Sequence, residues 1–150
     1  MSIAVYAGTF DPMHIGHIDI INKASKMFTK IIVLVAKNPS KTPYFSEQIR
    51  LDIINKSLSH LNNIVVDILP IGKTVVEYAH DNNAEFLIRG IRNEQDVQYE
   101  LTLADMNETL EPTINTIFIK GSKSLGSVSS SLVRELIKVH SNKATMFYKR

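Results

Sequence analysis

Short runs of consecutive apolar, mostly β-branched residues recur along the chain and indicate β-strands. Five such runs predict strands at Ile3–Ala7, Ile31–Ala36, Ile64–Leu69, Phe86–Ile88 and Thr116–Ile119. Apolar and polar residues hardly alternate within them, which is typical of strands that are covered on both faces.

Segments with apolar residues spaced three and four positions apart lie between and after these runs, as on one face of a helix. They predict five helices, within residues 15–28, 49–61, 75–79, 97–104 and 132–137. The alternation of strands and helices predicts an α/β fold, a doubly wound five-stranded parallel sheet of the Rossmann-like kind. No repeat or linker interrupts residues 1–150, so we expect one domain. Ligands of such sheets bind beyond the carboxyl ends of the strands.

Composition narrows the classes of function. The 150 residues are 44% apolar and 21% charged, as in an ordinary globular protein. Cysteine is absent, which excludes disulfides and thiolate chemistry. A net charge of +2 argues against a dedicated nucleic-acid binder. The longest apolar run is too short to span a bilayer, and the first residues do not resemble a signal peptide. We therefore expect a cytoplasmic protein without a nucleic-acid or membrane partner.

The first predicted strand leads into Gly8-Thr9-Phe10-Asp11-Pro12-Met13-His14-Ile15-Gly16-His17, directly before a helix. Gly8 can adopt backbone angles closed to other residues, and Gly16 would let a ligand approach the helix start. His14 and His17 share a face at the positive end of this helix. With free backbone N–H groups beside them, they predict a phosphate site. A metal pair completed by Asp11, or two surface histidines, are the alternatives.

Polar residues also follow the later strands. Lys41 lies in a loop between two prolines, and Arg89 and Arg92 flank Gly90 at the end of the fourth strand. Guanidinium groups hold phosphate oxygens in pairs, although structural ion pairs with Glu94 or Asp96 are the alternative. Ser129, Ser130 and Ser131 open the last helix, either as caps or as a phosphate cradle.

Together these motifs resemble those of the nucleotidyltransferase superfamily and, by their order, the bacterial phosphopantetheine adenylyltransferases of coenzyme A biosynthesis. The resemblance runs over nearly the whole chain. It implies transfer of the adenylyl group of ATP to 4′-phosphopantetheine, without a covalent enzyme intermediate, by a homohexamer. It also implies Mg²⁺, bound mainly through the ATP phosphates. Because no carboxylates cluster in the sequence, no residue is assigned as a metal ligand.

The resemblance implies roles for individual residues. Those with a catalytic role are His17, Lys41 and Arg92. Those implied to bind the acceptor substrate are Thr9, Lys41, Val75 and Arg89. Those implied to bind ATP are Thr9, Phe10, His17, Gly90, Ile91, Arg92, Glu100, Leu125, Gly126, Ser127, Val128, Ser129, Ser130 and Ser131. His14 occupies a position where the family often has threonine, and we expect it to replace that residue in contacting phosphate.

Three other functions remain open at this stage. A nicotinate mononucleotide adenylyltransferase would share the first motif but usually has a longer chain. A non-catalytic ATP-binding module would need the phosphate cradle, but not a second anion site at Lys41 and Arg89. A nucleic-acid binder would bind with a steep dependence on salt.

Overall fold

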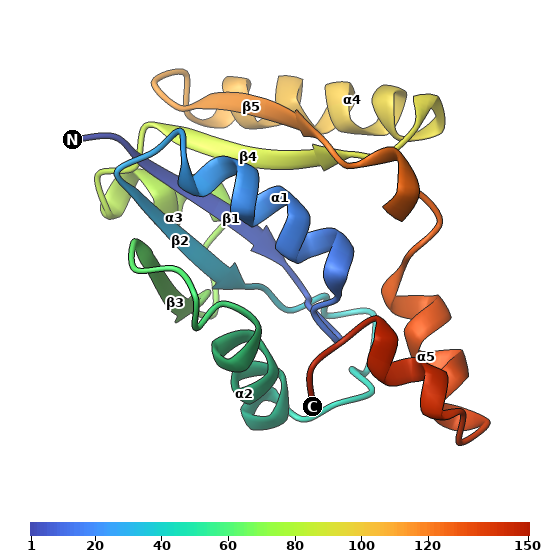
Figure 1. The fold of residues 1–150 in the computed structure, drawn as a ribbon. Helices are drawn as coiled ribbons and strands as arrows, with labels where there is room; N and C mark the ends of the chain where they lie inside the picture. The colour runs from blue at the N-terminus through green and yellow to red at the C-terminus, as the bar shows by residue number, and fades with distance from the viewer.

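The computed structural model describes residues 1–150 and contains one five-stranded sheet. Its strands are β1 (Ile3–Gly8), β2 (Lys30–Val35), β3 (Ile64–Ile68), β4 (Phe86–Ile91) and β5 (Asn115–Lys120). They lie in the order β3-β2-β1-β4-β5, with every neighbouring pair parallel (Figure 1). The five predicted strands and the doubly wound parallel sheet are therefore confirmed.

The helices also begin where the sequence supplies caps. They are α1 (Ile15–Ser25), α2 (Glu47–Ser57), α3 (Val75–Asp81), α4 (Glu94–Leu110) and α5 (Ser130–Lys138), with short 3₁₀ turns at Lys123–Leu125 and Asn142–Met146. The side chains of Ser46, Thr74, Asn93 and Ser129 each accept a backbone N–H at the start of a helix. The five predicted helices are confirmed.

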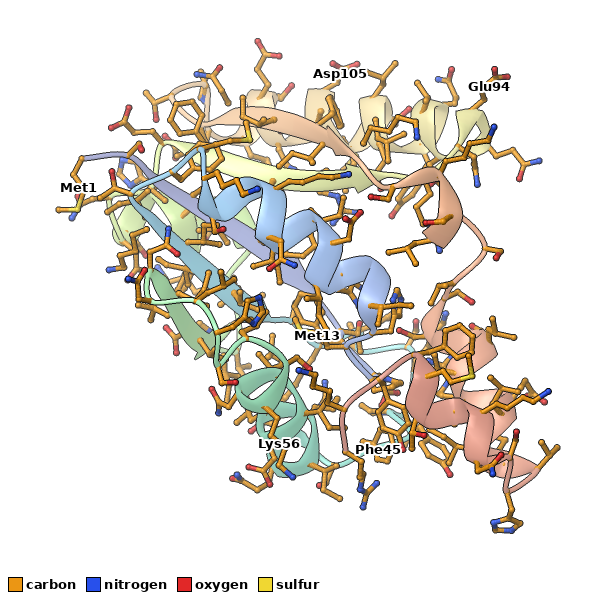
Figure 2. The ribbon with its side chains drawn as sticks, in the orientation of Figure 1. Met1, Met13, Phe45, Lys56, Glu94 and Asp105 are labelled. Atoms are coloured by element: carbon orange, nitrogen blue, oxygen red, sulfur yellow. The ribbon has the colours of Figure 1, made fainter.

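Helices cover both faces of the sheet, and successive residues of β1 enter two different cores. Ala4 and Tyr6 pack into the larger core with α1 and α2, whereas Val5 packs into the smaller one with α3. Figure 1 shows α1 in front of the sheet and α3 behind it. Met13 and Phe45, labelled in Figure 2, belong to the larger core. Burial on both faces explains why β1 and β2 lack an apolar/polar alternation.

The prediction of burial on both faces is wrong for β3. Its residues alternate between half-buried and exposed, and Val65 is 44% exposed. β3 is an edge strand, and α3 packs instead against β1 and β4, so that one face of β3 stays largely uncovered.

The end of the chain packs against the start of α1. Ala144 and Tyr148 are buried in the larger core. The backbone N–H of Ile15 donates to the carbonyl of Phe147 at 2.9 Å. Residues 141–150 thus support the turn before α1. None of the helices has the length and apolar character needed to cross a membrane.

Candidate active site

A cavity of about 330 Å³ opens at the carboxyl ends of β1, β4 and β5. We call it the first cavity. The start of α1 and the residues before and at the start of α5 complete its wall. Among the residues predicted to bind ATP, it is lined by Phe10, His17, Gly90, Arg92, Glu100, Leu125, Ser129 and Ser130. The folded chain therefore gathers these residues from five separate segments.

A second cavity of about 610 Å³ lies beside the first. Thr9 and Lys41 line it, together with Arg134 and Lys138 from α5. The wall residues common to both cavities are Phe10, His17 and Ser130. The two cavities thus adjoin at these residues, and the His17 imidazole could contact ligands in both.

The two histidines are bound to the backbone of their own turn. His14 is the N-cap of α1, and its Nδ1 accepts the N–H of Gly16 at 3.0 Å. The Nδ1 of His17 accepts the N–H of His14 at 3.1 Å, which completes a capping box. The expected set of free N–H groups at this helix is therefore wrong, because the two imidazoles and Phe147 occupy the N–H groups of His14, Ile15 and Gly16.

Burial keeps both imidazoles neutral near neutral pH. It lowers the pKa of His14 to about 4, with a further contribution from the positive charge of Arg92. Burial, followed by the neighbouring His14 and Arg92, holds the pKa of His17 well below its usual range. Because each Nδ1 accepts a hydrogen bond, each neutral ring carries its proton on Nε2. His17 can therefore donate a hydrogen bond from Nε2 without being charged.

The two glycines of the turn make room for aromatic rings. A Cβ on Gly16 would lie 2.8 Å from Cε1 of His14, so Gly16 makes room for the capping imidazole. The residue with left-handed backbone angles is Phe10, at φ 50°, and not Gly8. A Cβ on Gly8 would lie 3.1 Å from the Phe10 ring, so Gly8 instead accommodates that ring. Phe10 is 3% exposed, which shows that packing holds it in this strained conformation.

Arg89 in β4 and Arg92 just after it both line the first cavity, and both form hydrogen bonds with other residues of the protein. Arg89 makes a two-pronged ion pair with Glu100, at 2.7 and 2.8 Å, which raises the pKa of its guanidinium group. Arg92 donates to the carbonyl of Val128 at 2.7 Å, and its Nε lies 3.7 Å from Asp96. The structure thus brings Arg89 and Arg92 together but does not place Arg89 with Lys41, which lines the second cavity.

The serines at α5 act partly as caps. The Ser129 hydroxyl accepts the N–H of Leu132 at 3.1 Å, and the Ser130 hydroxyl donates to the carbonyl of Pro12 at 3.0 Å. The backbone N–H groups of Ser130 and Ser131 have no partner in the protein. The free donors expected at α1 are therefore found at α5, next to both cavities.

Several residues predicted to bind a substrate do not line either cavity. Five of them lie within two positions of residues that do, namely Ile91, Gly126, Ser127, Val128 and Ser131. Val75 begins α3 and packs against the smaller core.

Comparison with known proteins fixes the family. Residues 5–136 match the cytidylyltransferase-like family. A phosphopantetheine adenylyltransferase from Actinobacillus pleuropneumoniae is 42% identical over 132 residues, or 88% of this chain and 82% of the relative. One from a Synechococcus strain is 44% identical over 91% of this chain and 85% of the relative. One from Nostoc punctiforme is 45% identical over 89% of this chain and 72% of the relative.

The chain belongs to the phosphopantetheine adenylyltransferase family. Solved structures agree with the fold. A candidate nicotinate-nucleotide adenylyltransferase from Vibrio parahaemolyticus, 16% identical, aligns over 99% of this chain and 94% of its own with a TM-score of 0.72. A bifunctional NMN adenylyltransferase/ADP ribose pyrophosphatase from Francisella tularensis is 18% identical. It aligns over 95% of this chain and 44% of its own, with a TM-score of 0.69. The predicted family, fold and class of enzyme are confirmed.

The contacts of two residues beside the second cavity, Arg134 and Asp11, were not predicted from the sequence. Arg134 donates to the carbonyl of Asp11 at 2.8 Å and to the hydroxyl of Ser131 at 3.0 Å. The Asp11 carboxylate accepts the N–H groups of Tyr44 and Phe45 at 2.7 and 2.9 Å, which ties the Lys41 loop to the turn before α1. Arg134 lies one helical turn after Ser130, and this spacing could have indicated that its side chain reaches the same site. No local sequence pattern predicts the hydrogen bonds of Asp11, because its partners lie more than thirty positions away.

Nucleotidyltransferases typically use Mg²⁺, and the carboxylates of the first cavity allow a test of how it could be held. No group of three histidines or acidic residues could chelate a metal ion. Asp19 is bonded to Ser122 and Lys23, and Asp96 and Glu100 pair with arginines. The site thus fits an ion that enters with the nucleotide and keeps oxygen ligands from its phosphates.

Proposed function

We propose that the chain transfers the adenylyl group of ATP to 4′-phosphopantetheine, with ATP in the first cavity and the acceptor phosphate in the second. The observation that carries this assignment is the shared lining, where two cavities of different charge meet at His17. Membership of the phosphopantetheine adenylyltransferase family supplies the reaction, and the two cavities supply a place for each reactant.

In this proposal an oxygen of the 4′-phosphate attacks the α-phosphorus of ATP. A new phosphorus–oxygen bond forms, the bond from the α-phosphorus to the bridging oxygen breaks, and pyrophosphate leaves with dephospho-coenzyme A as the other product. Thr9 and Lys41 hold the acceptor phosphate, and His17 donates its Nε2 proton as a hydrogen bond to the reacting phosphate. No protein nucleophile takes part, so catalysis consists of positioning and stabilisation of charge.

The departing pyrophosphate would be held by Arg92 and by the N–H groups at the start of α5. Arg92 and Ser130 line the first cavity, and the free N–H groups of Ser130 and its neighbour Ser131 support anion binding there. Arg89 and Glu100 would act as one unit on the nucleotide side, since their ion pair holds both side chains. Phe10, Gly90, Ile91 and residues 125–131 complete the proposed nucleotide site, and Val75 the pantetheine side.

We also propose Mg²⁺ as the cofactor. The first cavity contains three carboxylates and two guanidinium groups, and its histidines are neutral. A triphosphate entering this cavity needs its own counter-charge, which Mg²⁺ supplies by neutralising phosphate oxygens. No residue of the chain is proposed as a direct ligand.

Pyrophosphate release tests the function. Purified protein is incubated with ATP, Mg²⁺ and either 4′-phosphopantetheine or nicotinate mononucleotide. Release with phosphopantetheine alone, with an equal amount of dephospho-coenzyme A, is the expected result. Release only with the mononucleotide would overturn the substrate. Tight ATP binding without release in either mixture would indicate a non-catalytic module.

A homohexamer of single-domain subunits in the cytoplasm is the proposed state of the enzyme. The long helix α4 supports self-association, because Tyr99, Met106 and Leu110 share one of its faces and are 65%, 57% and 59% exposed. Light scattering should give six times the mass of the 16.9 kDa chain. A monomer in solution would contradict this part of the proposal.

A further inference from the structure

Arg50 is a buried cation that the proposed mechanism does not use. It lies in the first turns of α2, four residues after the N-cap Ser46, and its side chain is 2% exposed. Its one hydrogen bond within the protein runs from NH1 to the carbonyl of Thr9 at 3.0 Å. Its Nε is buried without any partner, and no carboxylate forms an ion pair with it.

This arrangement is unfavourable for stability. A buried charge without a counter-ion loses its hydration and gains little in return, and a buried donor without an acceptor adds to that loss. Replacing Arg50 with an apolar side chain of similar volume would remove this desolvation cost, against the loss of one hydrogen bond to the Thr9 carbonyl. Packing of the fold therefore does not account for an arginine at this position.

The position of Arg50 relative to the turn does account for it. The carbonyl it binds belongs to Thr9, which lines the second cavity and directly precedes Phe10. Phe10 has left-handed backbone angles, so the turn needs external contacts to hold its shape. Arg134 holds the same turn from α5 through the carbonyl of Asp11. Two arginines from different helices thus fix two carbonyls of one strained turn.

We propose that Arg50 is a positioning residue for the transfer reaction. Its guanidinium group fixes the Thr9 carbonyl and hence the Thr9 side chain and the Phe10 wall between the cavities. This inference rests on the proposed function, because it assigns the acceptor phosphate to the second cavity.

The test compares three variants of the full-length enzyme. Arg50→Met keeps most of the side-chain volume and removes both charge and donors. Arg50→Lys restores the charge and one donor. Lys56→Met removes a charge from the same helix at an exposed position away from the turn (Figure 2). For each, kcat and KM for both substrates, the ATP dissociation constant and the thermal midpoint are measured.

We expect Arg50→Met to lower kcat/KM for 4′-phosphopantetheine at least tenfold, with an unchanged or higher thermal midpoint and an ATP dissociation constant within about twofold of wild type. Arg50→Lys should recover part of the loss, and Lys56→Met should match wild type. Stability and activity then move independently, which a purely structural role cannot produce.

Two results would overturn the proposal. One is an Arg50→Met enzyme with wild-type kinetics. The other is a loss of activity that follows a lowered thermal midpoint and is not reversed by lysine. The wild-type protein provides the separate check on function: if it fails to use 4′-phosphopantetheine, the proposed function fails, whichever way the variants behave in ATP binding and unfolding.

Discussion

The two cavities differ in whether their cationic side chains are paired with carboxylates. In the first, Arg89 and Arg92 are paired with Glu100 and Asp96, so the cations are largely neutralised before any ligand arrives. In the second, Lys41 and Arg134 form no ion pair, and Lys138 pairs only with an exposed glutamate on its own helix. The carboxylate of Asp11, which also lines the second cavity, is fully engaged by two backbone N–H groups.

This difference matches the two reactants that the function requires. A nucleotide that arrives with Mg²⁺ has part of its charge already neutralised and is suited to a site whose charges are internally balanced. A free phosphate group needs cations that are not committed elsewhere. Between the two cavities, a neutral imidazole can donate to either phosphate without adding charge, so the field of each cavity stays distinct.

Removing the His17 imidazole, which lines both cavities, should have the largest effect on catalysis. We expect His17→Ala to lower kcat by on the order of 10²–10³, because one preorganised donor is worth roughly 3–4 kcal/mol in the transition state. ATP affinity should fall much less. Steady-state pyrophosphate release and direct ATP binding measure the two quantities, and His60→Ala, which removes an exposed histidine bonded to Asn22, is the control. Equal losses in affinity and turnover would show that His17 acts in binding alone.

The next effect concerns the buried histidines of the first cavity and depends on pH. The folded protein keeps His14 neutral down to a pKa of about 4, whereas the unfolded chain binds that proton near pH 6.5. The stability that the neutral ring provides is therefore complete above pH 6.5 and is lost as the pH falls toward 4, by about 3 kcal/mol. Urea unfolding between pH 7.5 and 4 measures it.

His14→Asn is the matched variant for this measurement. Asparagine is a favoured N-cap and does not titrate, so the helix start is kept while the proton-binding group is lost. Its free energy of unfolding should fall less steeply with acid than that of wild type. The same slope in both proteins would show that His14 is not the group responsible.

Lys41→Gln tests the second cavity alone. A hydrogen bond to a charged group is worth roughly 1.5–3 kcal/mol, so KM for 4′-phosphopantetheine should rise by about 10- to 100-fold. KM for ATP should stay within about twofold of wild type. The control is Lys37→Gln, which removes a charge from the same loop at a residue that pairs with Glu47 and does not line this cavity. An equal rise of both KM values would contradict the assignment of one reactant to each cavity.

Much of the fold and part of the site could be predicted from local sequence. Buried strands, amphipathic helices and capping residues leave periodic or positional signals, and the motif residues follow strand ends as parallel sheets require. The pairing of Arg89 with Glu100 could not be predicted in the same way, because it depends on how α4 crosses β4. The contacts of Arg50 and Asp11 could not be predicted for a similar reason, since their partners lie 41 and 33–34 positions away.

The smallest effect concerns Gly16, which makes room for the His14 ring. A methyl group there would meet the His14 ring at 2.8 and 3.0 Å, and that ring lies against His17 with 3.8 Å between ring centroids. Gly16→Ala should therefore cost roughly 1–3 kcal/mol through overpacking. In a His14→Ala background the clash is gone, and the same change should stabilise by up to about 1 kcal/mol, because alanine is the better helix former.

Denaturant unfolding of the four proteins in this double-mutant cycle measures the coupling between the two residues. A reversal of sign would show that Gly16 serves the histidine cap. If Gly16→Ala left stability unchanged but weakened ATP binding in both backgrounds, the glycine would instead be needed for the close approach of a ligand to the helix. The ligand of the first cavity would then contact the backbone of α1, and the contrast between the two cavities would rest on shape as well as on charge.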